Sequence, residues 1–398
     1  MNKEQAQKQN GFGAHQWLLL LLPLLILAGL IGVFVQFDPL QTLTGSAPPL
    51  EQLTIERFVL DDQGITALVV NGGPEPVTVA QVIVDEAYWT FEIEPDATIP
   101  RLGRATISIP YPWVQGEAHE VVLVSGTGVT FAAGVEVALE TPKPDLGYWL
   151  VFAVLGFYVG VVPVGLGLMW FPLLKRLGKR GLNFILALTV GLLVFLLIDT
   201  VLEGIEIAQG IPGAFQAVPM VFFAGLLSFM ALVAAGRRQG AVQADPNRLW
   251  LATSIAIGIG LHNLGEGMAI GAAIALGEAA LGAFLVIGFT LHNITEGVAI
   301  GAPMAKDKPG WLRLAGLAAL AGGPAIVGTW IGGFSYSPFW AVFFLAIGAG
   351  AILQVVYEVT RLLLGSTQAH RDAFSWTNVA GLATGIAIMY ATALLVKF

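Results

Sequence analysis

The stretch LHNLGEGMAIG, Leu261 to Gly271, returns thirty residues later as LHNITEGVAIG, Leu291 to Gly301, with eight of the eleven positions identical. Both copies lie in long apolar segments, and both carry a histidine followed four residues later by a glutamate. Residues four apart lie on one face of an α-helix. Each segment is therefore expected to be a helix that presents an imidazole and a carboxylate side by side.

The composition indicates the class of protein to which these segments belong. Of the 398 residues, 56% are hydrophobic and only 12% are charged, and the mean hydropathy is +0.76. Soluble domains carry about twice that share of charge, whereas roughly 20 apolar residues suffice for a helix to cross a bilayer. The sequence therefore predicts an all-α polytopic membrane protein with nine membrane helices. The nine apolar runs are 16–36, 147–172, 182–203, 213–235, 249–276, 280–303, 313–333, 338–361 and 377–397.

Residues 50–145 have a different pattern. Segments rich in β-branched residues, such as ITALVV and VTVAQVIV, alternate with turn sequences such as NGGPEP. This pattern predicts an inserted antiparallel β-sandwich of about seven strands, with an immunoglobulin-like order as one option. The expected domains are thus an N-terminal tail and anchor (1–40), the β-domain (50–145) and an eight-helix membrane domain (147–398). The chain has no cysteine, which excludes disulfides and thiolate metal ligands.

The distribution of positive charge predicts how the chain crosses the membrane. Lys and Arg gather on the cytoplasmic side, and 14 of the 19 lie in inner segments if the N-terminus is cytoplasmic. The β-domain is then extracytoplasmic, and the protein is expected in the plasma membrane or a bacterial-type inner membrane. Residues 37–147 carry 16 acidic and 4 basic residues, an excess that attracts cations but is also common in solvated domains. The first apolar run is interpreted as an uncleaved anchor, with a cleaved signal peptide as the alternative.

The two motif copies lie in neighbouring runs joined by a turn near residues 276–281, which makes them an antiparallel hairpin. A turn centred at residue 279 would place His262 level with Glu296, and Glu266 level with His292. At about 1.5 Å per residue, all four side chains would lie near the middle of the bilayer.

Ionisable groups at that depth are costly and usually functional. Two imidazoles and two carboxylates form a ligand set for a divalent transition metal, with Zn²⁺ favoured and Fe²⁺, Mn²⁺, Co²⁺ and Cd²⁺ as alternatives. The competing interpretation is a pair of structural His–Glu hydrogen bonds that only tie two helices together.

The two motif copies resemble those of the ZIP family of divalent-metal transporters, whose fourth and fifth helices carry HNxPEG-type motifs. Residues 147–397 would supply the eight helices of the family, with the anchor and the β-domain as N-terminal additions. GLLVFLLIDTVLEG (191–204) resembles the second helix, and AIGAGAILQVVYEV (346–359) resembles the seventh. The resemblance implies import of metal into the cytoplasm by alternating access. It places the principal site at His262, Glu266, His292 and Glu296, and it gives Asn263 and Asn293 a role in holding a second ion.

The sequence also departs from the family pattern. Gly265 and Thr295 replace the proline of each motif, so a kink in these helices cannot be assumed. In the sixth helix Gly323 precedes Pro324, where the family often has a glutamate that completes a second site. A second bound metal is therefore in doubt.

Other polar residues are weaker candidates. Asp199 and Glu203 lie toward the outer end of the third run and could line an entrance, although Glu203 could simply be a solvated helix end. Glu358 lies near the inner end of its run and either lines an exit path or pairs with Arg361. His119 in the β-domain is interpreted as an exposed histidine without a special role, with ion binding beside its acidic neighbours as the alternative.

The leading hypothesis for function is a divalent-metal importer that is not an enzyme. An intramembrane metallohydrolase is the first alternative, but both copies have Asn after the His, where HExxH proteases have a catalytic Glu. A metal-sensing receptor is the second, but every inner segment is too short for an output domain. The expected partners are the lipid bilayer and metal ions, with no organic cofactor and no nucleic acid, and a homodimer is left open.

Overall fold

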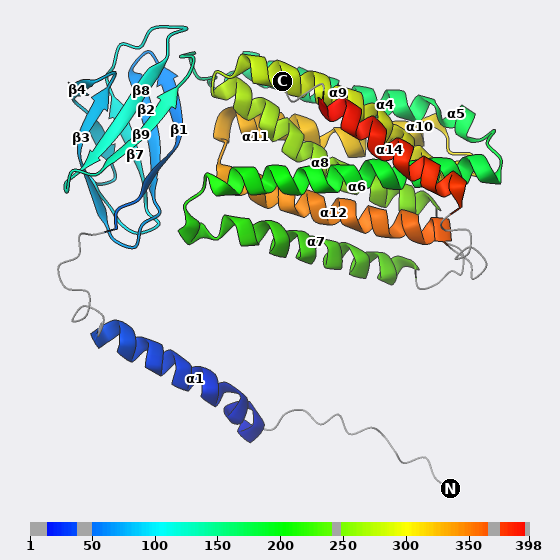
Figure 1. Ribbon diagram of the computed structural model, residues 1–398, viewed down its shortest axis with the longest axis horizontal. Coiled ribbons are helices and arrows are strands. Elements are labelled where there is room, and N and C mark those ends of the chain that lie inside the picture. Colours follow the sequence, from blue (N-terminus) through cyan, green and yellow to red (C-terminus); the bar gives the residue numbers. More distant parts are fainter. Residues whose placement is uncertain (1–13, 38–49, 241–247, 365–374, 395–398) are drawn as a thin grey trace. The chain divides into compact units, whose positions relative to one another are not determined.

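The computed structural model describes residues 14–37, 50–240, 248–364 and 375–394 (Figure 1). The chain divides into two compact units, Met1–Leu50 and Glu51–Phe398. The first unit contains helix α1 (Ala14–Phe37), which covers the predicted anchor. The second unit contains both the β-domain and the helical domain, which were predicted as separate domains.

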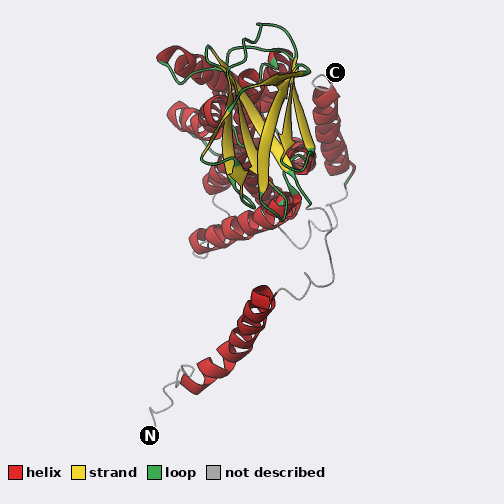
Figure 2. Ribbon diagram, turned by 90° about the vertical axis from the view of Figure 1, so that its left-hand side faces the viewer, coloured by secondary structure: helices red, strands yellow, loops and turns green. Residues whose placement is uncertain are grey.

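The β-domain is a sandwich of two antiparallel sheets (Figure 2). One sheet has the order β1-β2-β7-β5 and the other β4-β3-β8-β9, with β6 beside β3. This is the strand order of an immunoglobulin-like sandwich, with strands A, B, E and D in one sheet and C′, C, F and G in the other. The strands are β1 (Leu53–Asp61), β2 (Gly64–Asn71), β3 (Val77–Val84), β4 (Ala87–Trp89), β5 (Glu92–Glu94), β6 (Thr98–Ile99), β7 (Arg104–Ile109), β8 (His119–Ser125) and β9 (Thr130–Val135).

The core of the sandwich follows from the alternation seen in the sequence. Ile65, Ala67 and Val69 are buried on β2, and Val121 and Leu123 are buried on β8. Alternate strand residues point to one face, so both sheets bring apolar faces together. Nine strands form where about seven were expected because β4, β5 and β6 are only two or three residues long, too short for a periodic signal.

The helical domain accounts for residues 146–394 of the described chain (Figure 1). Its first long apolar segment consists of α3 (Leu146–Gly156), a π-helical turn (Phe157–Val161), α4 (Val162–Met169) and α5 (Phe171–Leu174). The remaining helices are α6 (Lys179–Gln209), a 3₁₀ turn (Gly213–Phe215), α7 (Ala217–Gly240), α8 (Arg248–Ala275), α9 (Ala279–Gly301), a 3₁₀ turn (Ala302–Met304), α10 (Trp311–Gly322), α11 (Pro324–Ser335), α12 (Pro338–Leu364) and α14 (Trp376–Leu394).

Seven helical segments of the described chain are long and apolar enough to cross a membrane, by length and composition. They correspond to seven of the nine predicted runs, namely all except the first and the fifth. The described apolar part of α1, Leu21–Phe34, is shorter than these. The fifth run is α8, which has 28 residues but a lower hydropathy because it carries His262, Asn263 and Glu266.

Helix α8 lies inside the bundle and packs against α9, α10, α11 and α12. A Cβ atom at Gly267 would collide with the Ala325 carbonyl of α11, and one at Gly271 would collide with that of Thr329. The missing side chains at these two positions therefore allow α8 to pack closely against α11. Both α8 and α9 continue as α-helix through Gly265 and Thr295. This packing keeps the polar face of α8 away from the outside of the bundle.

Candidate metal centre

The cluster at the centre of the bundle is formed by His262, Glu266 and His292. Their ligand atoms all lie within 4.8 Å of one another, and all three residues are buried. One carboxylate oxygen, Oε1 of Glu266, lies 2.9 Å from Nε2 of His262 and 2.5 Å from Nε2 of His292. The i,i+4 spacing in α8 and the hairpin with α9 thus bring two imidazoles to one carboxylate.

The alignment of the two helices differs from the prediction. The turn is Leu276–Glu278, and Gly277 adopts a positive φ of 80° there, a conformation that glycine tolerates best. His262 and His292 lie equally far from Gly277 along the chain, and their rings are 6.3 Å apart. The predicted contact of Glu266 with His292 is confirmed, but no hydrogen bond joins His262 to Glu296 among the described residues. The centre of the turn lies about two residues earlier than predicted, which changes the level of the helices relative to each other.

Glu296 lies one helical turn beyond His292 on α9 and is buried, with 4% of its surface exposed. Neither of its carboxylate oxygens has a hydrogen-bond partner in the described structure. A buried carboxylate without a partner is strongly unfavourable. This arrangement indicates that a cation, or a proton, belongs beside Glu296.

The two asparagines of the motif each bind an irregular stretch of backbone. Nδ2 of Asn293 donates to the Val159 carbonyl in the π-helical turn at 3.0 Å, and Nδ2 of Asn263 donates to the Ala321 carbonyl near the end of α10 at 3.1 Å. A carbonyl can accept only from the NH₂ group, so these contacts fix the orientation of both amides. The two Oδ1 atoms are buried and have no partner in the described structure. Both asparagines therefore have an oxygen lone pair available for a cation.

One polar residue of the site was not predicted from the sequence. Thr200 on α6 is buried, and its Oγ1 lies 3.0 Å from Nδ1 of His262. Its only sequence signal is a hydroxyl in an apolar helix, which is common and usually means a bond to the preceding turn. The acidic neighbour Asp199 was singled out instead, and it is only half-buried.

The weaker candidates lie outside the cluster of three. Glu203 on α6 is half-buried and close enough to His262 for their charges to interact. Glu358 lies 3.9 Å from Arg361 in α12, as in the predicted ion pair. Neither Asp199 nor Glu358 is brought into contact with the two histidines.

His119 of the β-domain is buried, and the prediction of an exposed histidine is wrong. Its Nδ1 lies 2.7 Å from Oδ2 of Asp85, which also accepts from the Tyr111 hydroxyl at 2.7 Å. Burial opposes ionisation of Asp85, but these bonds and the Glu120 amide outweigh it and hold its pKa below the usual value. The same bond from Tyr111, together with burial, raises the pKa of Tyr111 to about 12. This network ties the turn after β3 to the start of β8.

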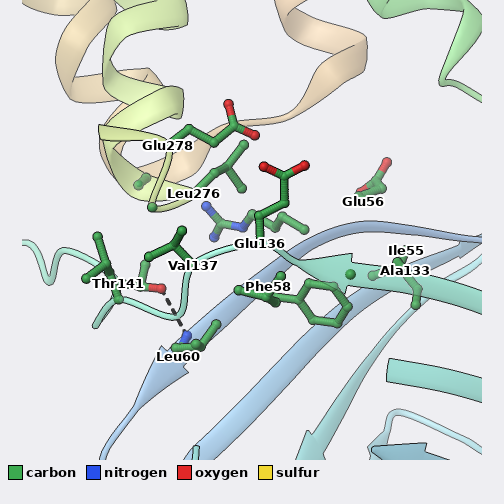
Figure 3. Close-up of a pocket in the computed structure, with 16 residues that line it drawn as sticks. Ile55, Glu56, Phe58, Leu60, Ala133, Glu136, Val137, Thr141, Leu276 and Glu278 are labelled. Carbon is green, nitrogen blue, oxygen red and sulfur yellow. Dashed lines mark hydrogen bonds between the residues drawn. The ribbon is translucent and has the colours of Figure 1, made fainter. Parts of the chain in front are cut away.

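A pocket of about 270 Å³ lies between the β-domain and the turn that joins α8 to α9 (Figure 3). Glu136 follows β9 and Glu278 immediately precedes α9, and Figure 3 shows both carboxylates in this pocket. Burial and then the nearby charge of Glu136 raise the pKa of Glu278 above its usual value. The β-domain thus contacts the hairpin that carries both motif copies.

The donor set of the central cluster fits a divalent transition metal. Imidazole nitrogens with carboxylate and amide oxygens suit Zn²⁺, Fe²⁺, Mn²⁺ and Co²⁺. Three of the predicted ligands converge, and the remaining three contribute unpaired buried oxygens on the same two helices. No protein-family model matches this chain, and no curated protein matches its sequence.

Proposed function

We propose that this chain is a transporter that carries divalent transition-metal ions, Zn²⁺ in particular, into the cytoplasm by alternating access. The observation that carries the proposal is the buried cluster of His262, Glu266 and His292 within a bundle of apolar helices. Such groups are costly in a membrane interior and usually mark the path of a substrate. The resemblance of the repeated motif to the ZIP family points to the same function.

The unpaired oxygens favour a cation over a purely structural role. Two His–Glu hydrogen bonds that only tied the helices together would leave no buried oxygen without a partner. Here Glu296 has two such oxygens, and Asn263 and Asn293 have one each. Buried polar groups are nearly always satisfied in folded proteins. A bound metal ion would satisfy these oxygens together with the imidazoles.

The residue after each histidine argues against a hydrolase. A metallohydrolase needs a base beside the metal to activate water. Asn263 and Asn293 occupy these positions, and both donate their amide hydrogens to backbone carbonyls. An amide cannot act as the base, so transport fits the site better than hydrolysis.

Zinc uptake into sealed proteoliposomes tests the proposal. The wild-type protein should admit Zn²⁺ to an enclosed fluorescent indicator. His262→Ala and Glu296→Gln should reduce uptake to the level of protein-free vesicles, because each removes a donor from the site.

Asp307→Asn is the matched control, since Asp307 is only partly buried and pairs with Arg248 at 3.6 Å, outside the cluster. Uptake by both site variants at the wild-type rate, with all proteins equally reconstituted, would reject transport through this site.

A further inference from the structure

The hydroxyl of Thr200 has a single proton, and the structure accounts for it. Oγ1 lies 2.8 Å from the carbonyl oxygen of Leu196, one turn earlier in α6. A carbonyl only accepts, so the hydroxyl proton is donated to Leu196. Towards every other neighbour Thr200 can therefore act only as an acceptor.

That constraint determines the role of the histidine nitrogen that it contacts. Nδ1 of His262 lies 3.0 Å from Oγ1 of Thr200, and both side chains are buried. Because Thr200 accepts, Nδ1 must carry a hydrogen. In a neutral imidazole the other nitrogen, Nε2, then has the free lone pair. Nε2 is the atom that faces Glu266 at 2.9 Å.

We infer that Thr200 is a positioning residue, whose hydroxyl holds His262 in the tautomer and ring orientation that present Nε2 to the metal. The inference rests on the proposed function, because it concerns the same metal site. Histidine ligands commonly donate their second N–H to a fixed acceptor, which orients the ring and strengthens the ligand. In the described structure His292 has no hydrogen bond at its Nδ1, so this support is specific to His262.

The hydroxyl that orients His262 comes from a helix outside the α8–α9 hairpin. His262 lies on α8, whereas Thr200 lies on α6, and α6 makes its main contacts with α12 and α14. The ring is thus held by a helix other than those that carry the motif. The structure therefore ties the geometry of the metal site to the position of α6.

Equilibrium binding of Zn²⁺ to the full-length protein in detergent tests the inference. Thr200→Val keeps the shape of the side chain and removes the hydroxyl that accepts from His262. Thr200→Ala removes the same hydroxyl and leaves a smaller side chain. Both should weaken zinc binding by about 10- to 100-fold, the range found when such partners are lost. Thr200→Ser retains the hydroxyl and should restore binding to within about twofold of the wild type.

Thr189→Val is the matched control. Thr189 is buried on the same helix and donates to the Ile185 carbonyl one turn earlier at 2.9 Å. It lies three turns from Thr200, about 16 Å along the axis, and does not contact the cluster. Its variant loses the same type of intrahelical bond, so zinc binding should be unchanged.

The outcomes separate this inference from the function on which it rests. Wild-type affinity in both Thr200→Val and Thr200→Ala, with binding abolished in His262→Ala, would overturn the role of Thr200 and leave the metal site standing. Equal losses of zinc affinity in Thr189→Val and Thr200→Val would also overturn it. The effect would then come from losing a hydrogen bond within α6, and the contact with His262 would not be needed to explain it. Absence of zinc binding in the wild type would instead reject the proposed function.

Discussion

At the scale of single residues, the site depends on one oxygen atom that faces two nitrogens. Oε1 of Glu266 lies within hydrogen-bond distance of Nε2 of both His262 and His292. A carboxylate oxygen and an imidazole lone pair repel each other, so each contact requires a proton or a cation between its atoms. For His262 the structure already assigns a hydrogen to Nδ1, through Thr200. A metal ion at Nε2 therefore satisfies that nitrogen and Glu266 together.

A second residue-scale network, in the β-domain, leads to a prediction about pH. Asp85 accepts hydrogen bonds from Tyr111, His119 and the Glu120 amide, and its pKa is lowered. A carboxyl with a lowered pKa stabilises the fold above its unfolded pKa of about 3.9, and this stability is lost as the pH falls further. Asp85→Asn should therefore destabilise the β-domain by about 1 kcal/mol at neutral pH and reduce the loss on acidification.

Hydrogen exchange of the β8 amides in the full-length protein, measured between pH 3 and 7, would test this prediction. Asn tolerates the left-handed backbone that Asp85 adopts, with φ at +48°, so the substitution changes charge rather than conformation. Glu86→Gln is the control, because Glu86 belongs to the same turn and is exposed. A similar change in both variants, or none in Asp85→Asn, would show that the network does not stabilise the domain.

The residues that sequence analysis recognised share one feature, which is an ionisable or amide group that is unusual in an apolar helix. Thr200 lacked that feature, because a threonine can satisfy its hydroxyl within its own helix. The role of Thr200 depends on which helix faces His262, and this is information about tertiary structure. His119 was misinterpreted for a related reason, since its partner Asp85 is 34 residues away.

At the scale of elements, the contact between α4 and α9 depends on a pair of glycines. A Cβ atom at Gly167 would collide with the Ile294 carbonyl, and one at Gly297 would collide with that of Val164. Ile294 lies between His292 and Glu296 on α9. The distance between α4 and α9 therefore decides where this half of the site lies.

Gly167→Ala should consequently destabilise the protein and weaken zinc binding. The added methyl group must separate two backbones, which costs about 1–3 kcal/mol in a well-packed core. Gly165→Ala is a close control, since Gly165 is also on α4 and a Cβ there meets nothing within 4 Å. That variant should be neutral or slightly stabilised, because alanine favours a helix over glycine. Thermal unfolding in detergent would contradict the prediction if the two variants behaved alike.

The helices themselves were largely predictable from runs of apolar residues, and their relative alignment was less so. Seven predicted runs correspond to helical segments that qualify as membrane spans. The hairpin turn was predicted about two residues too late in the sequence, because LGEAAL contains no proline and its single glycine, Gly277, lies near the start of the segment. When the centre of the turn moves by two residues, each residue of α8 comes to lie level with a residue of α9 four positions away. Four residues are about one helical turn. Thus the four candidate ligands were correctly placed on α8 and α9, but the contact of His262 with Glu296 was not found.

At the scale of the whole molecule, the β-domain meets the helical domain at the turn that joins the two motif helices. A Cβ atom at Gly277 would lie 2.6 Å from the Val137 carbonyl, so the loop after β9 packs directly on the turn. The neighbouring pocket contains Glu136 from the β-domain and Glu278 from the turn before α9. The β-domain therefore contacts the chain at the point where α8 ends and α9 begins.

The final prediction tests this contact through the repulsion between the two carboxylates. A carboxyl whose pKa is raised destabilises the fold when it is ionised, so the wild type should lose stability relative to Glu278→Gln as the pH rises through the pKa of Glu278. Glu136→Gln and Glu278→Gln should each raise the midpoint of thermal unfolding slightly at pH 7, because both groups are largely solvated. The double variant should gain less than the sum, since the repulsion can be removed only once. Strict additivity would mean that the charges of Glu136 and Glu278 do not interact across this contact.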